Sequence, residues 1–310
     1  MNYKHKLAAV LVCLAMMTSF VACDNGGQTS SGSNTSSETT STVSEDISSD
    51  TSSEESEESG SIGDKEELDQ DIKKKIDDAV KINSDVVGWL NIAGTNIDYP
   101  VLQNPDGKNV PISQVNQYYV GRDLYKKVSK NACIFADDYN QMGDRTELSR
   151  NTILYGHNWT NIEKNGAAVR MNDDRDVMFG QLLMFSDLDF AKKTPAFTFA
   201  TLDDNITWVV FAAFYTDTSF YYIEDAPTDS EFMKIVNGAI ERSEHIYDVD
   251  VRLSDKILTL STCTRRLGST DDQRFVVMAR ILRDNEKVED FAAPTDNPNP
   301  KRPSWYKGNR

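Results

Sequence analysis

Eight short segments rich in β-branched and aromatic residues constrain the fold of this 310-residue chain more than any other feature of its sequence. Turn-forming residues such as Gly, Pro, Asn and Asp separate them, and this arrangement is typical of strands joined by turns. Many short strands with few helices predict a mainly β fold, either a barrel or a sandwich with helical additions. The expected strands cover residues 88–92, 97–103, 132–137, 151–157, 196–201, 206–216, 256–263 and 274–282.

Three segments are expected to be helical. Residues 66–83 carry apolar side chains at helical spacing among Lys and Asp residues, which predicts an amphipathic helix with a solvated polar face. A longer helix is expected after Thr228, because apolar residues recur on one face and Thr228 with Glu231 matches a capping box. Residues 176–185 are a short helix candidate.

The N-terminal part of the chain contains a segment that cannot form a core. Residues 24–59 are rich in Ser and Thr and hold nine acidic residues but no Lys or Arg, within a chain of net charge −16. Such a segment buries too little apolar surface to offset its ordering entropy, so residues 24–63 are expected to be a disordered acidic stalk. The acidity and the lack of a basic, aromatic patch argue against nucleic-acid binding.

The first 23 residues have the layout of an export signal, with Lys4 and Lys6 before a mostly apolar run. The end of this run, "SFVAC", resembles the lipobox of bacterial lipoproteins, in which Cys23 would be lipidated. An uncleaved signal-anchor helix and a freely secreted form are the alternatives. All three place residues 64–284, the expected folded domain, outside the cytoplasmic membrane. The Pro-rich, basic residues 285–310 are expected to be extended and to lie outside the fold.

The cysteines and histidines do not suggest a metal or a disulfide framework. Outside the signal segment only Cys133 and Cys263 remain, fewer than expected for an exported domain stabilised by disulfides, although one bridge between them stays possible. The histidines His5, His157 and His245 lack paired zinc-ligand spacing. Residues 172–176 are acidic but would bind calcium only fortuitously, so no metal or cofactor is expected.

Cys263 stands at the end of an expected strand, followed by two arginines. Side chains alternate along a strand, so Cys263 shares a face with Thr259 and Ser261, while Leu258 and Leu260 point to the core. A thiolate is the nucleophilic form of cysteine, and neighbouring cations favour it. The alternative is an inert, buried cysteine, and the strand alone does not decide between the two.

His157 also stands at the end of an expected strand, whereas His245 fits a polar residue at the end of a helix. A lone histidine more often has a structural role, but a cysteine and a histidine at two strand ends match the pair needed for thiol acyl transfer. Such chemistry also needs a group that stabilises an oxyanion.

Three arginines are candidates for stabilising the oxyanion: Arg265, Arg266 and Arg274. The first two follow Cys263 in a loop and are expected to point to water. Arg274 opens the next strand, which can pair antiparallel with the cysteine strand and return Arg274 to Cys263. The geometry therefore favours Arg274.

These motifs together resemble the sortases, and specifically class B. The resemblance rests on "TLSTC" (259–263), "RFVV" beginning eleven residues after the cysteine, and "NTILYGHN" (151–158), and it extends over about residues 86–282. It implies an eight-stranded sortase-like β-barrel with an N-terminal helix and a long helix between strands six and seven. It also implies a membrane-anchored cysteine transpeptidase of Gram-positive bacteria, acting at the extracytoplasmic face of the cell membrane.

The resemblance assigns roles to residues of this chain. Cys263 would be the nucleophile, His157 the general acid that protonates the leaving amine, and Arg274, with the backbone N–H of Thr264, the group that stabilises the carbonyl oxygen. Asn158 would orient the imidazole. The peptide groove is expected to be lined by Ser261 and Thr262, by residues of the segment 217–222, among them Tyr221 and Tyr222, and by the long helix.

The implied substrates are the C-terminal sorting signal of an exported protein and an amine of a peptidoglycan cross-bridge or a pilin. Two alternatives remain at this point. One is a cysteine peptidase that hydrolyses its acyl-enzyme, and the other is a non-catalytic surface lipoprotein that binds a partner.

Overall fold

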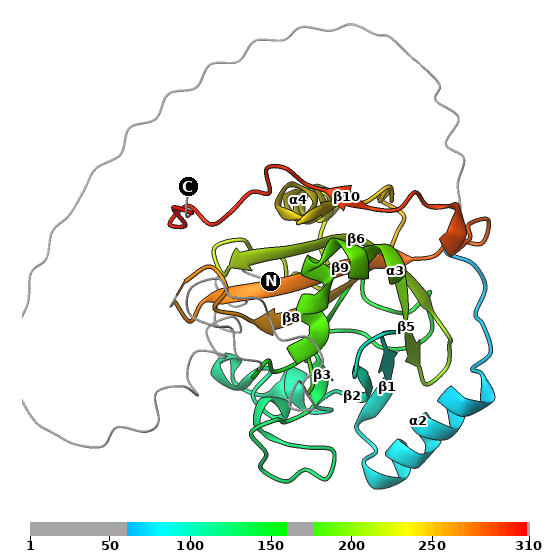
Figure 1. Cartoon of the computed structure of the whole chain (residues 1–310). Coiled ribbons are helices and arrows are strands. Elements are labelled where there is room, and N and C mark those ends of the chain that lie inside the picture. Colours follow the sequence, from blue (N-terminus) through cyan, green and yellow to red (C-terminus); the bar gives the residue numbers. More distant parts are fainter. Residues whose placement is uncertain (1–60, 160–176, 269, 309–310) are drawn as a thin grey trace, which may run out of the picture.

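Eight strands close into a barrel in the order β1-β2-β3-β4-β8-β9-β6-β5 (Figure 1). The computed structural model describes residues 61–159, 177–268 and 270–308. The prediction of a mainly β, eight-stranded barrel is confirmed, and the sandwich is excluded because β5 also pairs with β1. The barrel strands are β1 Val86–Asn91, β2 Asp98–Leu102, β3 Ile134–Ala136, β4 Asn151–Tyr155, β5 Ala196–Thr201, β6 Thr207–Asp217, β8 Ile257–Cys263 and β9 Gln273–Ile281.

The two sides of β8 and β9 pack against different layers. Leu258, Leu260 and the β9 residue Val277 belong to the cluster inside the barrel. On the outer side, Val276 and Met278 pack in a second cluster together with apolar residues of α4 (Asp229–Arg242). Because Cys263 alternates with the inward leucines, its side chain lies on the outer face.

The two main helices are close to the predicted ones. The first, α2 (Gln70–Ile82), is shorter than expected because the Asp69 carboxylate caps it by accepting a hydrogen bond from the Ile72 N–H at 2.8 Å. The predicted capping box of α4 is confirmed, with Thr228 and Glu231 exchanging hydrogen bonds. This helix lies between β6 and β8, the sixth and seventh barrel strands along the chain.

The described part of the segment predicted as a short helix at 176–185 contains a 3₁₀ helix, η5 (Gly180–Ser186), and the separate helix α3 (Leu188–Lys193) follows it. The structure also contains short 3₁₀ helices that the sequence did not suggest. They are η2 Gly107–Asn109, η3 Ile112–Gln114, η4 Tyr119–Gly121 and η6 Val288–Asp290.

The C-terminal tail is part of the fold, contrary to the expectation for residues 285–310. Its strand β10 (Thr295–Asp296) pairs antiparallel with β7 (His245–Ile246), directly after α4. His245 is consequently buried in a strand, and the prediction of a polar residue at a helix end is wrong. Its Nδ1 lies 3.4 Å from a carboxylate oxygen of Asp296 in the tail.

Several predictions concern residues outside the described part of the chain. They are the export signal at 1–23 with Cys23, the stalk up to residue 60 and the acidic run at 172–176. Among the described residues, no helix combines the length and hydropathy needed to cross a bilayer.

A buried ionic cluster stands at the end of β9 away from Cys263. The guanidinium of Arg283 forms two hydrogen bonds with the Asp255 carboxylate, at 3.0 and 2.7 Å, and both side chains are 1% exposed. Arg280 is fully buried and binds both carboxylate oxygens of Glu286. Burial alone would raise the pKa of Asp250, but contacts with Arg283 and then Arg252 outweigh it and lower the pKa to about 2.

We expect Asp255→Ala to lower the free energy of unfolding by about 3 kcal/mol, because it removes one partner of a buried ion pair. Asp78→Ala is the control, since Asp78 forms its ion pairs with Lys74 and Lys81 on the exposed side of α2. There the change should be much smaller than for Asp255→Ala, because solvent screens exposed ion pairs. Urea denaturation measures both, and equal effects would contradict a special role for the cluster.

Candidate active site

The pairing of β8 with β9 places Cys263 directly opposite Arg274. The N–H of Thr264 donates to the carbonyl of Gln273 at 3.2 Å, which makes Cys263 and Arg274 a pair without mutual backbone hydrogen bonds. Side chains approach closest at such positions, with Cα atoms typically about 4.5 Å apart. The predicted return of Arg274 to Cys263 is therefore confirmed.

The guanidinium of Arg274 is held in place by backbone carbonyls. Its Nη1 donates to the carbonyl oxygens of Asp271 at 3.1 Å and Gln273 at 2.9 Å, and the residue is only 4% exposed. Arg265 instead forms an ion pair with Asp271 at the surface, and it does not line the pocket that contains Cys263.

The parallel pairing of β4 with β8 brings His157 to the same end of the barrel. Tyr155 is the register partner of Ser261, so the chain reaches His157 as β8 reaches Cys263. Two side-chain hydrogen bonds join the segments beyond the ladder. The Thr262 hydroxyl donates to the carbonyl of Gly156 at 2.7 Å, and the Asn158 amide donates to the carbonyl of Cys263 at 3.1 Å.

The imidazole of His157 is oriented by a backbone carbonyl. Its Nε2 lies 2.7 Å from the carbonyl oxygen of Val120. A carbonyl can only accept, so Nε2 carries the hydrogen and Nδ1 is the nitrogen that can take up or release a proton. The ring also lies against Trp159, with centroids 5.1 Å apart, and Trp159 donates its indole N–H to the Lys130 carbonyl at 2.9 Å.

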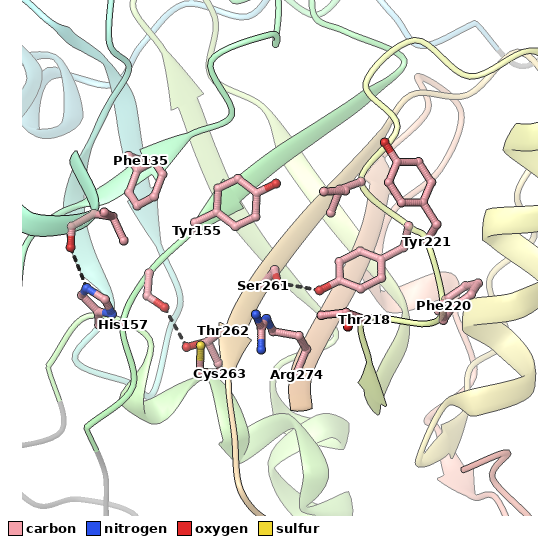
Figure 2. Close-up of a pocket in the computed structure, with 14 residues that line it drawn as sticks. Phe135, Tyr155, His157, Thr218, Phe220, Tyr221, Ser261, Thr262, Cys263 and Arg274 are labelled. Carbon is pink, nitrogen blue, oxygen red and sulfur yellow. Dashed lines mark hydrogen bonds between the residues drawn. The ribbon is translucent and has the colours of Figure 1, made fainter. Parts of the chain in front are cut away.

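One pocket on the outer face of the barrel contains all three groups. Figure 2 shows the side chain of Cys263 between His157 and Arg274. The loop from β6 to α4 forms the opposite wall with aromatic side chains, and the Tyr222 hydroxyl lies 2.8 Å from the hydroxyl of Ser261. The lining residues are Val120, Phe135, Tyr155, Gly156, His157, Thr218, Phe220, Tyr221, Tyr222, Ile223, Ser261, Thr262, Cys263 and Arg274.

The two cysteines of the described chain differ in environment. Neither forms a disulfide, so the possible Cys133–Cys263 bridge is absent. Burial, with a smaller effect of Asp123, raises the pKa of Cys133 to about 12 and keeps it protonated. Cys263 is partly exposed at the pocket, which makes it the accessible thiol of the two.

Two of the predicted site residues have other positions than expected. Thr264 does not line the pocket, and its N–H is engaged in the β-ladder with Gln273, so it is not directed to an oxyanion. Asn158 also lies outside the lining and holds the end of β8 through the Cys263 carbonyl. The carbonyl of Val120 contacts the imidazole at Nε2, and a contribution of Asn158 to its orientation stays a prediction.

Thr218 and Phe220 line the pocket and lie within the segment 217–222 that was expected to line the groove, whereas α4, also expected there, contributes none of the lining residues described. Val120 and Tyr155 were not predicted as part of the site. No signal exists for Val120, since every residue has a carbonyl. Among the described residues, no group of three His, Cys, Asp or Glu side chains is arranged to hold a metal ion.

Comparisons with known proteins agree with this geometry, although no protein-family model matches the chain. The chain is 33% identical to Sortase B of Listeria monocytogenes over 213 residues, which is 68% of this chain and 76% of that protein. It is 29% identical to Sortase B of Staphylococcus aureus over the same shares of both chains. The solved S. aureus sortase B–substrate complex has a TM-score of 0.55 and 28% identity, covering 69% of this chain and 87% of that one. Sequence and structure together show that this chain belongs to the sortase B family.

Proposed function

We propose that the protein is a cysteine transpeptidase that cleaves the sorting signal of an exported protein and transfers the acyl group to an amine. The observation that carries the proposal is the placement of Cys263 opposite Arg274 in a pocket that His157 also lines. The relative solved as a substrate complex supports a peptide substrate for the same fold. The acceptor amine belongs to a peptidoglycan cross-bridge or a pilin.

In the first step, the Cys263 thiol gives its proton to Nδ1 of His157, and the resulting thiolate attacks the carbonyl carbon of the scissile peptide bond. A C–S bond forms, and the carbonyl oxygen becomes an oxyanion beside the Arg274 guanidinium. The oxyanion then collapses, the C–N bond breaks, and the leaving amine takes a proton from Nδ1 of His157. The products are a thioester on Cys263 and the released C-terminal peptide.

In the second step, the acceptor amine attacks the thioester carbon. A C–N bond forms, the C–S bond breaks, and the sulfur leaves as the thiolate of Cys263. The proton lost by the amine returns to Nδ1 of His157 and from there to the thiolate, which restores the starting protonation of the pair. These two steps need neither a metal nor a redox cofactor.

The walls of the pocket are suited to hold a bound peptide. Tyr221 and Tyr222 from the β6–α4 loop face Ser261 and Thr262 of β8 across the pocket. We assign the peptide to this groove, next to the sulfur of Cys263. Residues 1–23 would tether the enzyme to the extracytoplasmic face of the membrane, through a lipid on Cys23 or as a signal-anchor.

We expect Cys263→Ala to abolish turnover while the fold remains intact, because among the described residues Cys263 supplies the only sulfur that lines the pocket. Cys133→Ala is the matched control and should keep activity, since that thiol is buried and donates to the Arg122 carbonyl. Cleavage of a sorting-signal peptide, together with covalent labelling by a thiol-reactive analogue, measures the effect. Equal loss in both variants would count against Cys263 as the nucleophile.

His157→Ala should also abolish turnover, because the leaving amine then has no proton donor at Nδ1. Its thermal unfolding midpoint should stay close to that of the wild type, as the ring is only partly buried. Full peptide cleavage by this variant would show that the proton comes from another group.

Arg274→Ala should lower kcat by about 10²–10³, the range seen when one oxyanion donor is removed. Arg265→Ala and Arg266→Ala should each change kcat much less, since neither lines the pocket. Steady-state kinetics with the three variants tests the assignment. If Arg266 proved to be the indispensable arginine, the assignment of the oxyanion-stabilising role to Arg274 would be wrong.

Transfer and hydrolysis are separated by the products. Mass spectrometry of reactions with and without a wall-peptide amine should show an amide product only when the amine is present. Hydrolysis with every amine tried would identify a cysteine peptidase. An unreactive Cys263 would identify a binding protein.

A further inference from the structure

The C-terminal tail follows α4 and then turns toward the active-site end of the barrel (Figure 1). After β10 it stays attached to the end of α4, where the Lys301 N–H donates to the Glu241 carbonyl at 2.9 Å. The guanidinium of Arg302 forms a bidentate ion pair with Glu244 and lies over the ring of Tyr215, 5.7 Å from its centroid. Pro303 is buried. These contacts place the residues after Pro303, among them Trp305, at the end of β6.

Trp305 is the residue through which the tail contacts the site. Its indole N–H donates to the Asp217 carboxylate at 2.6 Å. Its ring lies against Gly268, where an added Cβ would stand 3.4 Å from the nearest ring carbon. Trp305 therefore touches the two segments that follow β6 and β8 at once.

Asp217 links Trp305 to the aromatic wall of the pocket. It is the last residue of β6, only 4% exposed, and its second oxygen accepts from the N–H of Ser219 at 3.0 Å and from the Ser219 hydroxyl. Its carbonyl also accepts from the Phe220 N–H at 3.3 Å. One carboxylate thus fixes the start of the loop that carries the aromatic wall.

Gly268 belongs to the loop between Cys263 and Arg274. This loop is organised by Gln273, a fully buried residue whose amide group accepts from the Leu267 N–H at 2.9 Å. The same amide donates to the Gly268 carbonyl at 2.9 Å. Gln273 is also the register partner of Asp217 and the residue before Arg274. Trp305 and Gln273 consequently hold the loop next to the oxyanion-stabilising arginine.

We propose that residues 301–306 act as a strap and that Trp305 is a positioning residue for both loops beside Cys263. The indole N–H fixes the loop at 218–223 through Asp217, and the ring fixes the loop at 264–272 through Gly268. The part of this inference that concerns turnover rests on the proposed transpeptidase function.

The test compares Trp305→Ala, Trp305→Phe and Lys301→Ala in the full-length chain. Hydrogen exchange should become about tenfold faster or more in both loops of Trp305→Ala, as expected when a hydrogen bond to a charged group is lost. Trp305→Phe keeps a ring against Gly268 but loses the N–H, so only 218–223 should exchange faster. Lys301→Ala removes an exposed ion pair of the same tail and should match the wild type.

Kinetics separate positioning from a purely structural role. Trp305→Phe should raise KM for the sorting peptide with kcat nearly unchanged, because only the peptide-binding wall is loosened. Trp305→Ala should lower kcat as well, and should change the rate at which iodoacetamide alkylates Cys263. Unchanged exchange in both loops, or faster exchange spread evenly over the whole barrel, would overturn the proposal.

The exchange and alkylation measurements do not need turnover. If the wild-type protein transfers no acyl group, the proposed function fails, and these two measurements still decide whether the strap exists.

Discussion

The register of β8 between its two neighbours is the constraint on which the site depends. Its parallel pairing with β4 determines where His157 lies along the strand direction relative to Cys263. Its antiparallel pairing with β9 determines the same for Arg274. A slip by one residue would turn Cys263 into the barrel and expose Leu258 and Leu260, because side chains alternate strictly along a strand. The alternation of apolar residues along β8 therefore fixes the position of the Cys263 side chain, which is not part of the core.

The sequence predicted these features because they depend on local pattern. The eight strands followed from apolar segments and turns, and the outward face of Cys263 followed from alternation with Leu258 and Leu260. The choice of Arg274 over Arg265 required only that two consecutive strands pair antiparallel. Each inference used residues close in sequence or a pairing of neighbouring strands.

The features that could not be predicted depend on contacts between distant segments. The carbonyl of Val120 orients His157 across 37 positions of the chain, and a backbone carbonyl has no sequence signature. The strand pattern alone left a barrel and a sandwich open, because closure depends on β5 meeting β1, and the barrel was predicted only through the family resemblance. His245 and the tail were misjudged for the same reason. The pairing that buries His245 joins residues about fifty positions apart, and a Pro-rich composition does not indicate it.

The two ends of β9 show how the fold separates stability from chemistry. At one end, Arg280 and Arg283 are surrounded by carboxylates that neutralise their charge in the interior. At the other end, Arg274 is held by the carbonyls of Asp271 and Gln273. The carbonyl oxygens orient the guanidinium of Arg274 beside Cys263, its register partner.

The proposed role of Arg274 in stabilising an oxyanion requires that the loop before it is well ordered. A group stabilises a transition state most when it is already in place as the charge develops, since reorganisation would consume part of the gain. The carbonyls that hold Arg274 belong to the loop at 264–272 and to the first residue of β9. Their position depends on the buried amide of Gln273 and, through Gly268, on the ring of Trp305. The contacts that position the Arg274 guanidinium therefore extend from β9 to the C-terminal tail.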